Sequence, residues 1–249
     1  MSALLSTIFM PMSTLSPLRR QLPPVSNAAG SRLAVHVYSQ IRARIIRGEL
    51  AQNVHLVELD LVRELGAGRT PVREALQLLE SEGLVVSKDG GRLRMFVAPM
   101  SSAEQREIAE ILAILEGFAA ARLASLAADA RSSVVEELKQ IHAAFAHNAS
   151  MKAPSEERLF EKHRDFHAAI VRNSRHSLLL STHAPVSARM ERYEWLYGHR
   201  LPGTLRSSIA EHAAIIGAIK RGRVNEAERA MRANWLNASA RLETVLQTK

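Results

Sequence analysis

The sequence predicts a mostly α-helical protein, in which an N-terminal winged helix-turn-helix precedes a C-terminal all-α bundle of about six helices. Three observations lead to this fold class. Apolar residues recur at helical spacing in three stretches between residues 34 and 83. An Asp-Gly-Gly turn at 89–91 then separates two short strand-like runs. From Ser102 onward, strand signals disappear and helical periodicity continues to about residue 246.

The first helix is predicted from Ala34, because Val37, Ile41 and Ile45 recur every four residues along one face, and Gly48 ends it. A short strand or an extended segment is expected within Val54–Glu58. The second helix has Leu61, Val62 and Leu65 on its apolar side, and it ends at Gly66.

The third helix has the strongest start signal in the chain. Thr70 supplies a hydroxyl suited to the N-cap, and Pro71 suits the first helical position. Its buried face is predicted to carry Val72, Ala75, Leu76 and Leu79, and Gly83 ends it. The hairpin that follows is expected to pair 84–88 with 92–98.

The second half is predicted to form helices at 102–128, 131–149, 155–173, 175–199, 204–221 and 223–246. Residues 1–31 are rich in Ser, Pro and Met without any period, and we expect a disordered arm there, or a translation start at Met10 or Met12. The domain boundaries are therefore expected at 32–100 for the winged domain and 101–249 for the helical domain.

The composition narrows the class of protein. A net charge of +8 favours polyanionic partners, and the absence of cysteine excludes disulfides, thiolate metal sites and cysteine nucleophiles. No apolar run is long enough for a membrane span, so no membrane partner is expected. The apolar stretch Leu4–Met12 precedes Arg19 and Arg20, the reverse of the order in a secretory signal. We therefore expect a cytoplasmic protein.

The start of the third helix carries a candidate DNA-reading group. Arg69 and Arg73 are four residues apart with Thr70 between them, so all three are predicted to project from one end of the helix. Helix-turn-helix proteins present this end to the major groove, where arginine pairs with guanine. The helix N-terminus adds donors for phosphate. The alternative is a solvated basic face on an ordinary helix.

This segment resembles the signature of the GntR family of bacterial repressors. The resemblance is carried by Gly66–Leu76 (GAGRTPVREAL) and Leu79–Val85 (LESEGLV), and it covers about residues 34–98. It implies that Arg69 and Arg73 contact bases or nearby phosphates and that Thr70 contacts phosphate.

The resemblance also implies that a wing tip at Gly90 and Gly91 enters the minor groove. Arg92 follows the tip and is expected to hold the DNA backbone, with a solvated strand edge as the alternative. Gly68 stands where the family usually has Ser or Thr, which implies one phosphate contact fewer. Because one winged helix reads only a few base pairs, we expect a homodimer on a palindromic double-stranded operator.

Polar residues interrupt the predicted inward faces of three helices in the second half. His163 and His167 lie on the apolar stripe of one helix, His212 on that of another and Asn234 on that of the last. Histidines four apart on one helix face suit a divalent cation, and other helices of a bundle can complete the ligand set. The alternative is buried histidines satisfied by hydrogen bonds.

This half resembles the FCD effector domain of the FadR-type branch of the GntR family. The matching pieces are Phe166-His167 with Ile170, Glu211-His212 leading to Ile219, and Ala230–Asn234, within about residues 104–246. Six helices rather than seven would suit the VanR-like subgroup. Metal-binding members use one aspartate and three histidines. Here His163 stands at the aspartate position and Asn234 at the last histidine.

The resemblance therefore implies either zinc or nickel on His163, His167 and His212, or a metal-free site that binds an anion directly. The expected effector is a small carboxylate, an organic acid or a sugar acid, contacting Asn234. Leu112 stands where the family often has arginine. Arg189 is expected to take over carboxylate binding, with a solvated arginine as the alternative.

The sequence leaves two other functions to consider. A metal-dependent hydrolase of the zincin type needs His-Glu-x-x-His, but Arg164 follows His163, so the general base is absent and we expect no enzyme. A DNA-binding protein without an effector would use its helical half only to dimerise. The expected function is a transcription regulator, a repressor controlled by its effector.

Overall fold

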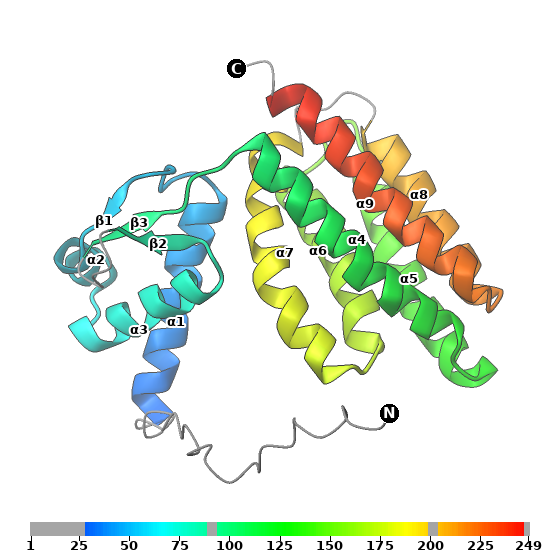
Figure 1. Cartoon of the computed structure of the whole chain (residues 1–249), viewed down its shortest axis with the longest axis horizontal. Coiled ribbons are helices and arrows are strands. Elements are labelled where there is room, and N and C mark those ends of the chain that lie inside the picture. The colour runs from blue at the N-terminus through cyan, green and yellow to red at the C-terminus, as the bar shows by residue number, and fades with distance from the viewer. Residues whose placement is uncertain (1–27, 89–93, 199–203, 247–249) are drawn as a thin grey trace, which may run out of the picture.

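The computed structural model describes residues 28–88, 94–198 and 204–246. Two parts lie side by side, a small domain of helices with one sheet and a larger bundle of helices (Figure 1). Each has its own hydrophobic core. The connection between them is short, because β3 ends at Val97 and α4 begins at Ser102. The predicted fold class is confirmed.

The small domain contains α1 (Ala28–Ile46), β1 (His55–Leu56), α2 (Glu58–Leu65), α3 (Arg69–Ser81), β2 (Val85–Ser87) and β3 (Met95–Val97). The strands form an antiparallel sheet in the order β1-β3-β2, in which Phe96 is opposite both His55 and Val86. Ile41, Leu79 and Leu84 are fully buried in the core beneath it.

Two local predictions need correction. Helix α1 begins at Ala28, inside the segment 1–31 that was expected to be disordered, and alanine has the highest helix propensity. The N-cap of α3 is Gly68 rather than Thr70, and Thr70 lies in the first turn. Pro71 is accommodated there because the first turn leaves its N–H groups without intrahelical partners.

Residues 1–27 lie outside the described residues, and so do Gly90, Gly91 and Arg92 of the expected wing tip. None of the helices that the structure describes is both long and apolar enough to cross a membrane.

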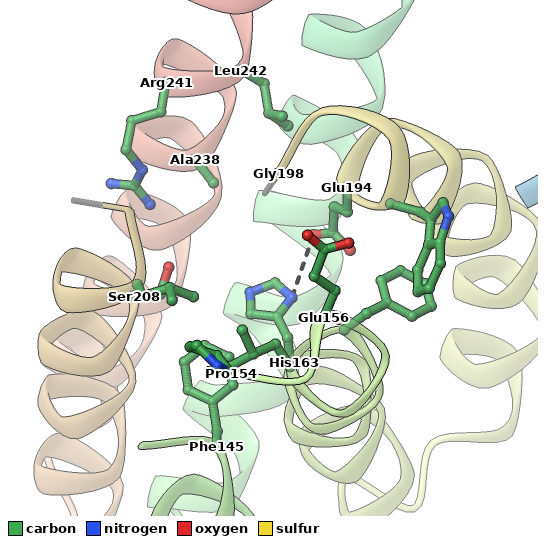
Figure 2. A pocket seen from close by; sticks show the side chains of 14 residues that line it. Phe145, Pro154, Glu156, His163, Glu194, Gly198, Ser208, Ala238, Arg241 and Leu242 are labelled. Atoms are coloured by element: carbon green, nitrogen blue, oxygen red, sulfur yellow. Dashed lines mark ion pairs between the residues drawn. The ribbon is translucent and has the colours of Figure 1, made fainter. Parts of the chain in front are cut away.

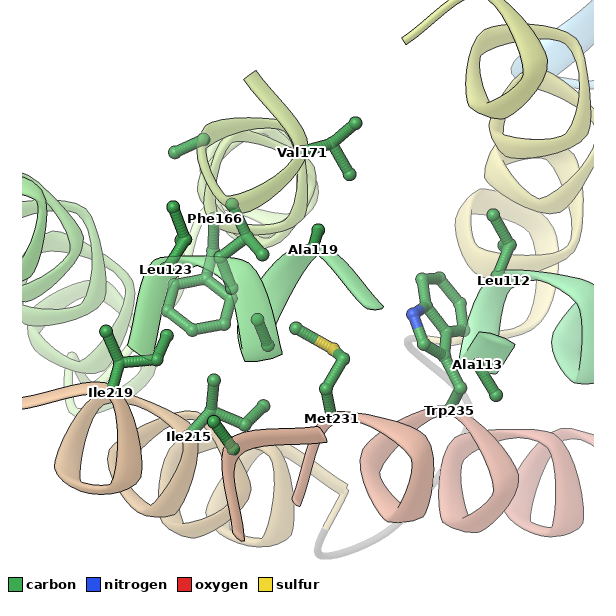
Figure 3. Close-up of a cluster of buried hydrophobic side chains, with 14 of the residues drawn as sticks. Leu112, Ala113, Ala119, Leu123, Phe166, Val171, Ile215, Ile219, Met231 and Trp235 are labelled. Atoms are coloured by element: carbon green, nitrogen blue, oxygen red, sulfur yellow. The ribbon is translucent and has the colours of Figure 1, made fainter. Parts of the chain in front are cut away.

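The second half contains α4 (Ser102–Ala124), α5 (Ala128–Ala149), α6 (Glu156–Asn173), α7 (Ser177–Tyr197), α8 (Thr204–Lys220) and α9 (Val224–Leu246). Helices α4 and α9 run along each other (Figure 1). Leu123, Phe166, Ile219 and Met231, one residue from each of α4, α6, α8 and α9, meet in the core (Figure 3).

Helix α7 lies on the side of the bundle that faces the small domain, and it packs there against α1 (Figure 1). Its Ala188 is buried within the core of the small domain. Arg42 of α1 forms an ion pair with Glu191 at 3.0 Å, and Arg192 donates to the carbonyl of Ala98 at 3.0 Å. The two domains are therefore joined through α7 as well as through the chain.

Candidate functional site

The N-terminal end of α3 presents the three residues that were expected to read DNA. Arg69, Thr70 and Arg73 are exposed there, whereas Val72, Ala75, Leu76 and Leu79 on the other side of the same helix are buried. No side chain among the described residues caps this helix, so its first N–H groups remain free to donate to a phosphate.

A carboxylate orients one of these arginines. The Arg73 guanidinium donates to both oxygens of Glu58 at 3.0 and 3.1 Å. Both side chains border a hollow of about 300 Å³ between the start of α2 and α3, and Arg69 lines the same hollow. Glu58 thus fixes the orientation of the Arg73 guanidinium in the absence of DNA.

The three predicted histidines come together in the bundle. His163 and His167 are one turn apart on α6 and His212 is on α8, and one ring nitrogen from each lies within 4.8 Å of the others. The His212 ring stacks on Phe166, with 3.9 Å between ring centroids. This cluster is buried except for His163, which is half-buried.

Glu116 of α4 lies behind the cluster and is completely buried. Its carboxylate is 2.6 Å from Nδ1 of His167 and 2.7 Å from Nε2 of His183 on α7. Burial alone would raise the pKa of Glu116, but the charge and hydrogen bonds of the two imidazoles lower it well below its ordinary value. Glu116 is therefore an ionised group that fixes the ring of His167 and leaves Nε2 of that ring without a partner among the described residues.

His212 is the most unusual member of the cluster. It is fully buried, and neither of its ring nitrogens has a hydrogen-bond partner in the part of the chain that the structure describes. Burial lowers its pKa well below the ordinary value, and His163, His167 and His142 lower it further. A neutral imidazole with free nitrogens is the form that binds a metal ion.

Asn234 is buried, but its side chain bonds to Glu211 and is not part of the histidine cluster. Its amide nitrogen donates to Glu211 at 2.9 Å, and Arg241 donates to both oxygens of the same carboxylate at 2.9 and 3.0 Å. Burial would raise the pKa of Glu211, but the hydrogen bonds from Arg241, Asn237 and Asn234 lower it. Asn234 thus helps to hold Arg241 through Glu211.

A cavity of about 350 Å³ opens beside the histidine cluster (Figure 2). His163 forms part of its wall and lies 3.5 Å from Glu194 of α7. Burial lowers the pKa of His163, but the charge of Glu194 and the hydrogen bond to it raise the pKa by more. The lining residues are Phe145, Pro154, Glu156, Leu159, Phe160, His163, Glu194, Trp195, Gly198, Leu205, Ser208, Ala238, Arg241 and Leu242.

Arg189, the arginine expected to bind a carboxylate effector, is not part of this wall. Its guanidinium is ion-paired with Glu104, and its side chain packs over Gly83 of the small domain. Arg192 is buried between the domains. Among the described residues of the wall, the arginine is Arg241.

Sequence reasoning overlooked Glu116, His183 and Glu194 as parts of the site. The first two could have been found as His212 was, because each interrupts an apolar stripe. Glu116 lies four residues after Leu112, and His183 lies four after Leu179. Glu116 and Glu194 also place negative charge beside His167 and His163, although His163 stands at the position where metal-binding relatives have an aspartate.

Comparisons with known proteins match both halves of the chain. Residues 33–94 match the model described as "Bacterial regulatory proteins, gntR family", and residues 107–236 match the FCD domain. A helix-turn-helix transcriptional regulator of Agrobacterium vitis is 32% identical over 129 residues, which are 49% of this chain and 73% of the relative. The gluconate operon transcriptional repressor of Bacillus licheniformis is 28% identical over 166 residues, 67% of this chain and 65% of the relative.

Solved structures share the fold. McbR/YncC of E. coli superposes with a TM-score of 0.68 at 21% identity, covering 87% of this chain and 99% of that one. A GntR transcriptional regulator from Rhodococcus sp. RHA1 gives a TM-score of 0.64 at 20% identity, covering 86% and 98%.

Proposed function

The chain belongs to the GntR family of bacterial regulatory proteins, with an FCD domain following its DNA-binding domain, and from that premise we propose a repressor controlled by a small organic acid. The family consists of DNA-binding transcription regulators rather than enzymes. The repressor role is supported by the similarity to the gluconate operon repressor. The observation that carries the sensor role is a cavity beside the histidine cluster, in which buried ring nitrogens of His167 and His212 have no partner among the described residues.

DNA binding is assigned to α3. The exposed arginines Arg69 and Arg73 would contact base edges or nearby phosphates, and Thr70 with the uncapped helix N-terminus would contact a phosphate. The wing-tip contacts of Gly90, Gly91 and Arg92 remain part of the proposal. A homodimer would place two such helices on the half-sites of a palindromic operator.

His163, His167 and His212 fit a divalent ion such as zinc or nickel. Their ring nitrogens converge, and the free nitrogens of His212 and His167 would otherwise carry an unmet desolvation cost of about 1–3 kcal/mol each. Glu116 would act behind the ligands, since a carboxylate on the second ring nitrogen fixes the orientation of a metal-binding histidine. A bound ion would supply a coordination position for an oxygen of the effector.

The effector would occupy the cavity that His163 borders. We assign its carboxylate to the histidine cluster and to Arg241, in place of the Arg189 expected from the sequence. Asn234 would act indirectly, because it holds Glu211, which in turn holds Arg241.

Helix α7 would transmit the binding of the effector from the cavity to the DNA-binding domain. Glu194, Trp195 and Gly198 line the cavity, whereas Glu191 and Arg192 on the same helix contact the small domain. Pro185 lies inside α7 and removes one backbone hydrogen bond from it, which favours a bend there. A ligand that draws this helix toward the cavity would therefore change how α1 and α3 are presented to DNA.

The test is His167→Ala, with His147→Ala on the exposed face of α5 as the matched control. We expect the purified His167→Ala protein to lose bound metal, and to lose the rise in thermal stability that zinc gives the wild type over its value in chelator; stability in chelator should also fall, because the hydrogen bond to Glu116 is removed. His147→Ala should behave as the wild type. A His167→Ala protein that keeps both its metal content and its response to organic acids would favour the effector-free dimer instead.

A further inference from the structure

We propose that the effector is an aromatic monocarboxylic acid with a hydrogen-bond donor at its far end, rather than a polyhydroxylated sugar acid. This inference rests on the proposed function, because it takes the cavity beside the histidine cluster as the effector site. It is carried by the chemistry of the cavity wall and by the placement of its few polar groups.

Most of the wall is apolar. Phe160 and Trp195 meet edge to face with 5.1 Å between ring centroids, and Phe145 and Leu205 extend the same surface. Such a wall accepts an aromatic ring with its edge-to-face preferences intact. A sugar hydroxyl facing it would leave water without finding a new partner, which weakens binding about tenfold or more for each hydroxyl.

The polar groups of the wall stand on two sides. Arg241 and Ser208, from α9 and α8, are on one side, and Glu194 and Glu156 are on the other, with His163 between them (Figure 2). The terminal nitrogens of Arg241 are bonded to Glu211, but its Nε is buried and unpartnered within the described ranges. The side with Arg241 and Ser208 therefore suits a carboxylate.

The side with Glu194 and Glu156 has the opposite preference. Two carboxylates there would repel a second acid group of a ligand, and they would accept a hydrogen bond from a hydroxyl or amino group. A dicarboxylate is therefore disfavoured, and a phenolic hydroxyl opposite the carboxylate is favoured.

The volume of the cavity limits the size of the acid. A cavity of about 350 Å³ corresponds to about a dozen water-sized volumes at 30 Å³ each. One ring with a short acid arm and one hydroxyl fits within that space.

The test measures binding to the full-length, zinc-loaded protein by calorimetry with three probes: para-hydroxyphenylacetate, phenylacetate and gluconate. We expect para-hydroxyphenylacetate to bind about tenfold more tightly than phenylacetate, and gluconate to bind at least a hundredfold more weakly than para-hydroxyphenylacetate. Gluconate binding as tightly as phenylacetate would overturn the inference and leave the sensor function standing. Absence of binding by all three acids would count against the sensor function itself.

Two alanines of α9 offer a matched pair of variants. Ala238 lines the cavity and Ala240 is exposed on the same helix. Ala238→Phe should weaken para-hydroxyphenylacetate at least tenfold, and Ala240→Phe should leave its affinity unchanged. Equal affinities in the two variants would place the acid outside this cavity.

A variant of Glu156 tests whether the hydroxyl of the acid donates to the side of the cavity that carries Glu156 and Glu194. Glu156 is exposed at its rim, so Glu156→Gln should fold normally and narrow the preference for the hydroxylated acid from about tenfold to about threefold. An unchanged preference would remove the acidic side from the proposal.

Discussion

Glu116→Gln is the change that most directly tests how the histidine site is held. The wild-type carboxylate accepts from His167 at 2.6 Å and from His183 at 2.7 Å in a fully buried position. The amide that replaces it has one oxygen and one NH₂ group. It can accept from one ring, but it can keep the second bond only if that ring changes tautomer.

The magnitude follows from these two bonds. A hydrogen bond to a charged group contributes about 1.5–3 kcal/mol, and the amide loses the charge for one ring and the bond itself for the other. We therefore expect the free energy of unfolding of the helical domain to fall by about 3–5 kcal/mol. At about 2–4 °C per kcal/mol, the midpoint temperature should fall by about 6–20 °C.

The assay is urea unfolding followed by circular dichroism, in chelator at about pH 7, where Glu116 is ionised. Glu110→Gln, on the exposed face of the same helix, is the control, and a change within about 0.5 kcal/mol is expected there. A loss below about 1 kcal/mol in Glu116→Gln, together with unchanged zinc affinity, would refute the assignment of Glu116 as the group that holds this site.

The other predictions concern DNA, assembly and the domain junction. Arg69→Ala or Arg73→Ala should each weaken operator binding by about 1–3 kcal/mol in a gel-shift assay, with exposed Arg172→Ala of α6 unchanged; wild-type affinity in both would reject α3 as the reading helix. Light scattering at micromolar concentration should give the mass of a homodimer, and a monomer would contradict the palindromic operator. Burial and the hydrogen bond to Glu104 raise the pKa of Tyr193 above 10.0, so the stability it contributes is complete below about pH 10 and is lost as the pH rises further. Tyr193→Phe should remove about 0.5–1.5 kcal/mol of stability at neutral pH and reduce that alkaline loss in a thermal melt.

Helical periodicity predicted most of the fold, because a helix that buries one face carries apolar residues at regular spacing along the sequence. All six helices of the bundle appear within a few residues of the predicted ranges, and Gly48, Gly66 and Gly83 end or follow their helices with positive φ. The start of α3 was placed two residues late, at Pro71 instead of Arg69. Threonine at an N-cap is only a preference, and glycine with extended backbone meets the same need.

The site was predicted in part. The convergence of His163, His167 and His212 followed from their positions on apolar stripes. The position of Arg241 did not, because only the packing of α8 against α9 brings it to Glu211 and to the cavity wall. Spacing on one helix also cannot show that Arg189 turns toward the other domain, where it packs over Gly83.

The position of α7 has a consequence for building hybrid regulators. A graft that exchanges the DNA-binding half at the short connection around residues 98–101 would separate Arg42 from Glu191 and the carbonyl of Ala98 from Arg192. The incoming half would meet a helix surface shaped for a different partner, with Ala188 left outside any matching core. A functional hybrid therefore requires the domain-facing residues of α7 to be exchanged along with the winged domain, although they lie about ninety residues further along the chain.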